Sequence, residues 1–207
     1  MNLRNSQRAL WTVLVIALIA IGAFALSKWL GQRNAAPPLD DFGTIPNFSL
    51  VNERGQSVSR DDLKGHIWIA DLFFTRCVTV CPIMTGQMHT LQTALKDQPE
   101  IRLVSFSADP TNDSISTLAT YAAEHGANPK QWQFLTGPVS AIYAITKDGF
   151  HLPLDSVGGD QNPPIVHSTR FVLIDARGHI RGYYLGSEAD VTKKVLAGID
   201  ALKNEHS

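Results

Sequence analysis

The sequence of 207 residues predicts an α/β domain with a mixed central sheet flanked by helices, preceded by one N-terminal transmembrane helix. Three observations predict this class. Apolar runs of strand length alternate with segments in which apolar residues recur at helical spacing. Two apolar runs near the C-terminus flank a glycine turn, as in an antiparallel hairpin. A segment of nineteen residues near the N-terminus carries no charge.

The uncharged segment extends from Ala9 to Ser27, with basic residues on both sides. A helix of this length spans about 28 Å at about 1.5 Å per residue, which is close to the thickness of a bilayer core. We therefore predict a cytoplasmic tail at 1–8, a transmembrane anchor at 9–30 and a linker at 31–45. The alternative is a cleaved secretory signal, although its apolar region is usually only about 7 to 15 residues long.

The charge distribution predicts the compartment and excludes one class of partner. The tail contains Arg4 and Arg8 and no acidic residue, so the positive-inside rule keeps it in the cytoplasm. We expect a single-pass inner-membrane protein whose globular domain, 46–207, lies in the periplasm or, in a mitochondrion, in the intermembrane space. From Asp40 onward lie all 19 acidic residues but only 14 of the 18 basic ones, without a basic cluster. We therefore expect no nucleic-acid partner.

The globular domain is expected to begin with a hairpin and a buried strand. Phe48–Val51 and Gln56–Val58 flank a glycine turn, which is typical of a β-hairpin. Ile67–Phe74 is apolar apart from Asp71, as in a strand that is covered on both faces. Pro82 then suits the first turn of a helix. Apolar residues recur along this helix at Met84, Met88, Leu91 and Leu95.

The alternation of strands and helices continues in the middle of the chain. The strand Ile101–Phe106 precedes a run of cap-forming side chains, 109–113, which is expected to start a helix that ends at Gly126. A short strand at Trp132–Leu135 and a helix from Pro138 to Ile145 follow.

The C-terminal part is expected to contain a loop, a hairpin and a closing helix. Polar, glycine and proline residues make 148–164 a long surface loop. The strands 169–175 and 180–185 pair around a glycine turn, and a helix follows from about 188 to 204. This order of elements is compatible with a thioredoxin-like fold.

The two cysteines, Cys77 and Cys81, lie where the central strand passes into a helix. The helix dipole and the unpaired amide groups stabilise a thiolate there, and Arg76 is expected to add to this effect. Such a pair can bind a soft metal or form a disulfide. A lowered thiol pKa favours both functions and therefore does not distinguish between them. Three residues lie between the cysteines, compared with two in thioredoxin-type oxidoreductases. An inert structural disulfide is disfavoured because the position makes the thiols reactive.

A histidine can complete a metal site with the two sulfurs. Two thiolates select Cu(I) or zinc, and an added imidazole suits copper in either oxidation state. Of the seven histidines, His151 and His167 remain after those at helix ends, in turns and far along a helix are set aside. His167 directly precedes an apolar strand, whereas His151 lies within the long loop. The residues themselves leave the choice open.

Three motifs resemble the Sco/SenC family of copper-binding assembly factors. They are 74–82 with both cysteines, 106–110 together with Asp113 and Tyr121–Ala122, and Val166–Thr169. The likeness extends from about Pro46 to the C-terminus and includes the anchor. It implies a thioredoxin-like domain that binds one copper ion, Cu(I) or Cu(II), through Cys77, Cys81 and His167. It also implies a role in maturing the binuclear copper centre of cytochrome c oxidase, by delivering copper, by reducing the cysteines of that centre, or both.

The resemblance also implies partners. These are the copper subunit of cytochrome c oxidase, other copper chaperones or thiol reductants, and the membrane through the N-terminal helix. Two positions depart from the family pattern, because Val78 replaces a frequent proline and Val166 a frequent acidic residue. These departures affect copper affinity and redox tuning more than ligand identity. Thioredoxin-like oxidoreductases, as a family, place a cis-proline just before the strand that faces the active-site helix. In this chain that strand is expected at 169–175 and no proline directly precedes it, which favours metal binding over plain disulfide exchange.

Several alternatives remain open at this point. A thiol-disulfide reductase that keeps the oxidase cysteines reduced needs both sulfurs but no histidine. Peroxide reduction of the peroxiredoxin type would use Thr75 and Arg76 to cradle one cysteine. Met84 is expected to fill the core rather than bind copper. Asp71 is either a partner of the metal ligands or an edge residue that reaches solvent.

Overall fold

The structure is a computed structural model that describes residues 11, 13–24, 39–152, 155–157 and 165–205. The chain forms two units, Met1–Pro38 and Leu39–Ser207. In the first unit, residues 13–24 of the predicted anchor are helical, and the rest of that anchor, apart from residue 11, lies outside the described residues. Within the described part of the chain, no helix is long and apolar enough to cross a membrane.

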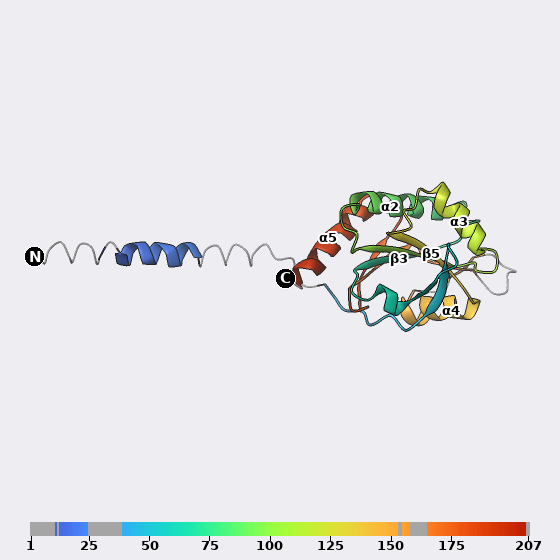
Figure 1. The fold of residues 1–207 in the computed structure, drawn as a ribbon, viewed down its shortest axis with the longest axis horizontal. Coiled ribbons are helices and arrows are strands. Elements are labelled where there is room, and N and C mark those ends of the chain that lie inside the picture. Colours follow the sequence, from blue (N-terminus) through green and yellow to red (C-terminus); the bar gives the residue numbers. More distant parts are fainter. Residues whose placement is uncertain (1–10, 12, 25–38, 153–154, 158–164, 206–207) are drawn as a thin grey trace, which may run out of the picture. The chain divides into compact units, whose positions relative to one another are not determined.

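A mixed sheet forms the centre of the second unit, as predicted (Figure 1). Its seven strands among the described residues have the order β2-β1-β5-β4-β3-β8-β9. The parallel centre consists of β3 (Trp68–Phe73), β4 (Arg102–Ser107) and β5 (Trp132–Thr136). The antiparallel strands on either side are β1 (Ser49–Asn52), β2 (Ser57–Ser59), β8 (Arg170–Ile174) and β9 (Ile180–Leu185).

Helices cover both faces of this sheet (Figure 1). One face packs against α2 (Cys81–Ala94), α3 (Ile115–Glu124) and α5 (Val191–Glu205). The other packs against the 3-10 helix η1 (Arg60–Leu63), α4 (Val139–Ala144) and the π-helical turn η2 (Ile145–Gly149). Successive side chains of β3 enter opposite cores, with Ile69 in one and Ala70 in the other. This two-sided burial explains the nearly continuous apolar run.

Part of the predicted surface loop 148–164 is regular structure. Residues Asp155–Val157 form β6, which pairs antiparallel with β7 (Ile165–His167), so the loop prediction is wrong there. Three-residue strands are too short to produce a recognisable alternation of apolar and polar residues. Residues 153–154 and 158–164 lie outside the described part of the chain.

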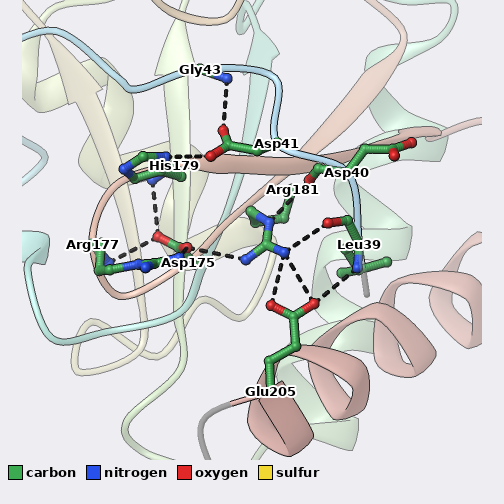
Figure 2. Close-up of polar contacts among 9 residues, drawn as sticks. All are labelled: Leu39, Asp40, Asp41, Gly43, Asp175, Arg177, His179, Arg181 and Glu205. Atoms are coloured by element: carbon green, nitrogen blue, oxygen red, sulfur yellow. Dashed lines mark hydrogen bonds and ion pairs between the residues drawn. The ribbon is translucent and has the colours of Figure 1, made fainter. Parts of the chain in front are cut away.

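Residues 39–45 of the predicted linker 31–45 belong to the second unit, which begins at Leu39 rather than at 46. Phe42 N donates to the carbonyl of Ile180 (2.9 Å), and Ile180 N donates to that of Gly43 (2.8 Å). The guanidinium of Arg181 holds the start of this segment by donating to the carbonyls of Leu39 and Asp40 (Figure 2). Residues 31–38 lie outside the described residues.

Candidate metal centre

Residues 74–80, which we call the thiol loop, connect the end of β3 to the start of α2. Cys81 is the first residue of α2, and Pro82 follows it in the first turn, where proline is tolerated because the missing N–H has no helical partner. Cys81 is 1% exposed in the core beneath α2, whereas Cys77 in the loop is half-buried. Both are free thiols, and they lie at the junction of strand and helix that the sequence predicts.

The two thiols have unequal acidity. Cys77 Sγ accepts a hydrogen bond from Cys81 N (3.4 Å) and lies 3.7 Å from Thr79 Oγ1. Burial opposes ionisation of Cys77, but the hydrogen bonds from Cys81 and Thr79 outweigh it and lower its pKa to about 7. Burial raises the pKa of Cys81, and so do its hydrogen bond to Cys77 and the charges of Cys77 and Asp71. Cys77 is therefore the first thiolate to form and the first to meet a partner.

This asymmetry predicts the pH dependence of alkylation. About half of Cys77 is expected to be thiolate at pH 7, since its pKa is about 7, whereas an ordinary thiol with a pKa near 8.5 is only a few per cent ionised. The rate of iodoacetamide labelling, followed by peptide mass spectrometry, should rise through about pH 7 at Cys77 and stay low at Cys81. Equal labelling of both cysteines in the folded protein, as expected after denaturation, would contradict this assignment.

Two carboxylates that follow β4 hold the thiol loop. Asp113 is fully buried and accepts hydrogen bonds from Thr75 Oγ1 (2.5 Å) and Ser107 Oγ (2.6 Å). Burial raises the pKa of Asp113 in spite of these hydrogen bonds. Asp109 forms an ion pair with Arg76, in which Arg76 Nη2 lies 2.6 Å from Asp109 Oδ2. The sequence had led us to expect that Arg76 stabilises the thiolate.

These contacts correct the interpretation of 109–113 as a helix cap. The cap of α3 is Ser114, whose side chain accepts from Thr117 N (3.1 Å). The role of Asp113 in the site was missed, and a role of Asp109 in shaping a loop near the site was set aside in favour of a helix-initiating turn. The available signal was a run of cap-forming residues longer than one helix start requires.

Five histidines have described side chains, and none of them joins the thiols. His66 Nδ1 bonds the carbonyl of Glu100, at the end of β3 remote from the thiol loop. His89 Nδ1 bonds the carbonyl of His125, and the ring of His125 packs on that of Tyr121. The other two, His151 beside Gly43 and His179 paired with Asp41, lie near the start of β9. The possibility that His151 reaches the thiols is therefore wrong. Among the described residues, no three His, Cys, Asp or Glu side chains form a group suited to a metal.

His167 is the last residue of β7, opposite Asp155. Its side chain lies outside what the structure describes. The backbone of β7 approaches that of β3, with Cα atoms of the two strands within 8 Å of each other. The strand that contains His167 thus lies beside the strand that leads to Cys77.

Met84 and Asp71, which the sequence places near the thiols, are both buried. Met84 is 1% exposed and lies in the core under α2, in agreement with its predicted role as core filler. Asp71 is 2% exposed, so the alternative of an edge residue that reaches solvent is wrong. Its Oδ1 has no hydrogen-bond partner, and burial raises its pKa to about 7. Its charge in turn raises the pKa of Cys81.

A mixed α/β domain with a reactive thiol pair between a central strand and a helix belongs to the thioredoxin-like class of proteins. Within this class, the SCO1/SenC family model matches residues 38–203, and the chain belongs to that family. A SCO1 protein homolog of Bacillus subtilis is 36% identical over 146 residues, which are 70% of this chain and 75% of the relative. The resemblance seen in the three motifs is thereby confirmed.

Solved structures agree with this assignment. A SCO1/SenC family lipoprotein from Bacillus anthracis has a TM-score of 0.73 at 30% identity and covers 81% of this chain and 99% of its own. BsSco, a member of the Sco family of cytochrome c oxidase assembly proteins with a disulfide switch, has a TM-score of 0.70 at 30% identity and covers 80% of this chain and 98% of its own.

Two relatives are described as copper proteins. A putative copper-binding protein of Stutzerimonas stutzeri is 29% identical over 143 residues, which are 67% of this chain and 68% of the relative. ScoI of Bradyrhizobium japonicum, solved with copper bound, shares the fold with a TM-score of 0.64 at 19% identity, over 77% of this chain and 99% of its own.

Proposed function

We propose that this chain is a membrane-anchored copper metallochaperone for the binuclear copper centre of cytochrome c oxidase, with Cys77, Cys81 and His167 as copper ligands. The observation that carries the proposal is the pair of adjacent, unequally acidic thiols at the start of α2 in a member of the SCO1/SenC family. The copper described for relatives supports the choice of metal. The copper subunit of the oxidase is the proposed recipient.

The donor chemistry fits copper as cargo. Thiolate ligands select soft ions such as Cu(I), and the ligands must lose their protons to bind. Cys77 ionises near neutral pH, and metal binding offsets the cost of deprotonating the buried Cys81. In transfer, thiolates of the recipient replace the ligands one at a time. Cys77 is the first to be displaced because it is the more exposed of the pair.

Two observations support His167 as the third ligand. The five histidines with described side chains lie elsewhere, and β7 lies beside β3. In the pairing of β3 with β8, Ala70 stands opposite Val172. Extending that register by five residues along each strand would bring residue 167 level with Thr75, two residues before Cys77.

The proposal of a membrane anchor is based on the amino-acid sequence. The uncharged segment 9–27 includes the helix at 13–24, and the basic tail before it favours export of the folded unit. The proposed location is a bacterial inner membrane with the copper domain in the periplasm, or the intermembrane space in a mitochondrion.

The His167→Ala variant tests the ligand set. Cu(II) affinity should fall by at least about tenfold, since even partners that only orient a metal ligand contribute about 10- to 100-fold. The visible and EPR spectra of the Cu(II) complex should change as well, and titration of the purified full chain in detergent measures both. His151→Ala is the matched control and should behave like the wild type. An unchanged Cu(II) spectrum in His167→Ala would remove this residue from the site.

A second candidate function is thiol-disulfide reduction of the oxidase cysteines. The low pKa of Cys77 next to a buried thiol favours it, and BsSco contains a disulfide switch. If reduction is the cellular function, His167→Ala should still support oxidase assembly. Peroxide reduction is less well supported, because Thr75 and Arg76 are engaged by Asp113 and Asp109.

A further inference from the structure

The position of Cys77 depends on the thiol loop, whereas Cys81 is fixed by α2. Cys81 lies in the first turn of the helix with its side chain in the core. Cys77 precedes the helix, and its backbone N–H bonds to Phe74 O (3.1 Å) within the same loop. Contacts that hold the beginning of the loop therefore act on the separation of the two sulfurs, together with the hydrogen bond from Cys81 N to Cys77 Sγ (3.4 Å).

Asp113 holds the beginning of the loop. Thr75 donates to it twice, from Oγ1 (2.5 Å) and from the backbone N–H (3.3 Å to Oδ2). Ser107, at the end of β4, donates to Oδ2 at 2.6 Å. The carboxylate is fully buried, and 38 residues separate it from Thr75. Charge-assisted hydrogen bonds to a buried carboxylate are stronger than neutral ones, so this is a firm attachment.

Asp109 adds a second attachment one residue further along the loop. Its carboxylate pairs with Arg76 (2.6 Å) and accepts from Asn112 Nδ2 (2.8 Å). Its backbone N–H donates to Ser107 Oγ (3.1 Å), so the hydroxyl of Ser107 connects the carboxylate of Asp113 to the backbone of Asp109. The Arg76 side chain is 52% exposed, which makes this ion pair the weaker of the two attachments.

We propose that Asp113, assisted by Asp109, is a positioning residue that sets the place of the Cys77 sulfur relative to Cys81 and thereby tunes both copper coordination and disulfide formation. A ligand held in its bonding geometry loses less freedom when it binds, which is the benefit of preorganisation. The copper part of this inference rests on the proposed function. The disulfide part does not, because it needs only the two thiols.

The test removes one hydrogen bond while keeping the shape of the side chain. Thr75→Val deletes the hydroxyl donor to Asp113 and keeps the backbone N–H donor, and Thr75→Ser retains both. Thr146→Val is the matched control: Thr146 is buried on the other face of the sheet, and its Oγ1 donates to Ile142 O at 2.8 Å. Each valine variant thus loses one hydroxyl hydrogen bond, but only one of them loosens the thiol loop.

The thiol-disulfide equilibrium of the full chain is measured in glutathione buffers. In Thr75→Val the equilibrium constant for forming the Cys77–Cys81 disulfide should fall roughly fivefold, as expected for the loss of one hydrogen bond. The Cu(II) spectrum should shift in the same variant. Thr75→Ser should restore both values, and Thr146→Val should match the wild type in both while losing stability.

Two outcomes overturn the inference. If Thr75→Val matches the wild type in both the disulfide equilibrium and the Cu(II) spectrum, the carboxylate does not position Cys77. If Thr146→Val shifts both readouts as much as Thr75→Val, the effect is general destabilisation. Wild-type protein that binds no copper would instead refute the proposed function, and the disulfide equilibrium would still test the positioning role.

Discussion

Replacing Cys81 by serine is expected to reduce Cu(I) affinity by on the order of 10²–10³-fold, since structural zinc sites share about 10–16 kcal/mol of binding energy among four ligands. A hydroxyl oxygen is a hard donor that Cu(I) does not favour. Because Cys81 is buried, another soft donor cannot take its place without repacking the core. Competition with a Cu(I) chelator under anaerobic conditions measures the affinity.

Two variants of Cys81 separate its metal-binding role from its effect on Cys77. The Cys81 thiol donates a hydrogen bond that helps to lower the pKa of Cys77 to about 7. Serine keeps a donor at this position and alanine does not. Both variants should lose Cu(I) affinity, but only Cys81→Ala should clearly raise the pH at which Cys77 is alkylated. Loss of copper with no such difference would show that the hydrogen bond does not matter to Cys77.

The control for these variants is Met84→Leu. Met84 contains the other buried sulfur at the start of α2, three residues after Cys81, and it packs in the same core. Leucine fills a similar volume, so the domain should remain folded. Cu(I) affinity should be unchanged. If Met84→Leu weakened Cu(I) binding as much as Cys81→Ser, the proposed donor set would be incomplete.

The main elements of the fold were predictable because their signals are local. Ile67–Phe74 is apolar on both faces, and this pattern is typical of a central strand such as β3. The thiols were placed correctly because a strand, two cysteines and a proline follow one another within a few residues. By contrast, β6 has three residues, which is too short for periodicity to reveal a strand.

The parts of the site that were missed depend on contacts distant in sequence. Aspartates that cap a helix and aspartates that bind a loop elsewhere have the same local pattern, so Asp113 was interpreted as a cap although its partner Thr75 is 38 residues away. The same reasoning applies to Arg181. Its partners Leu39 and Glu205 are 142 and 24 residues away, and nothing around Arg181 in the sequence indicates them.

The substitution Arg181→Met is expected to destabilise the folded unit by about 3–5 kcal/mol, the usual cost of removing one partner of a buried ion pair. Arg181 is 6% exposed and contacts two carboxylates, Asp175 at 3.3 Å and Glu205 at 2.8 Å (Figure 2). It also donates to the carbonyls of Leu39 and Asp40. Methionine fills the space but satisfies none of these oxygens. Urea unfolding followed by circular dichroism measures the loss.

The matched control is Arg177→Met, since Arg177 pairs with the same Asp175 from the solvent side, 3.2 Å away and 61% exposed. It should cost no more than about 1 kcal/mol, as exposed ion pairs usually do. Equal losses in the two variants would show that burial of Arg181 does not decide its contribution.

The pH dependence gives a further check on the role of Arg181. Burial opposes ionisation of Asp175, but hydrogen bonds from His179 and Arg177 outweigh it and lower its pKa. A lowered pKa contributes stability that is present above the unfolded value and is lost as pH falls through the folded value. Without Arg181 the buried carboxylate has one cation fewer, so its pKa should rise. The difference in stability between wild type and Arg181→Met should therefore shrink as the pH falls from neutral, because Asp175 takes up its proton at a higher pH in the variant than in the wild type.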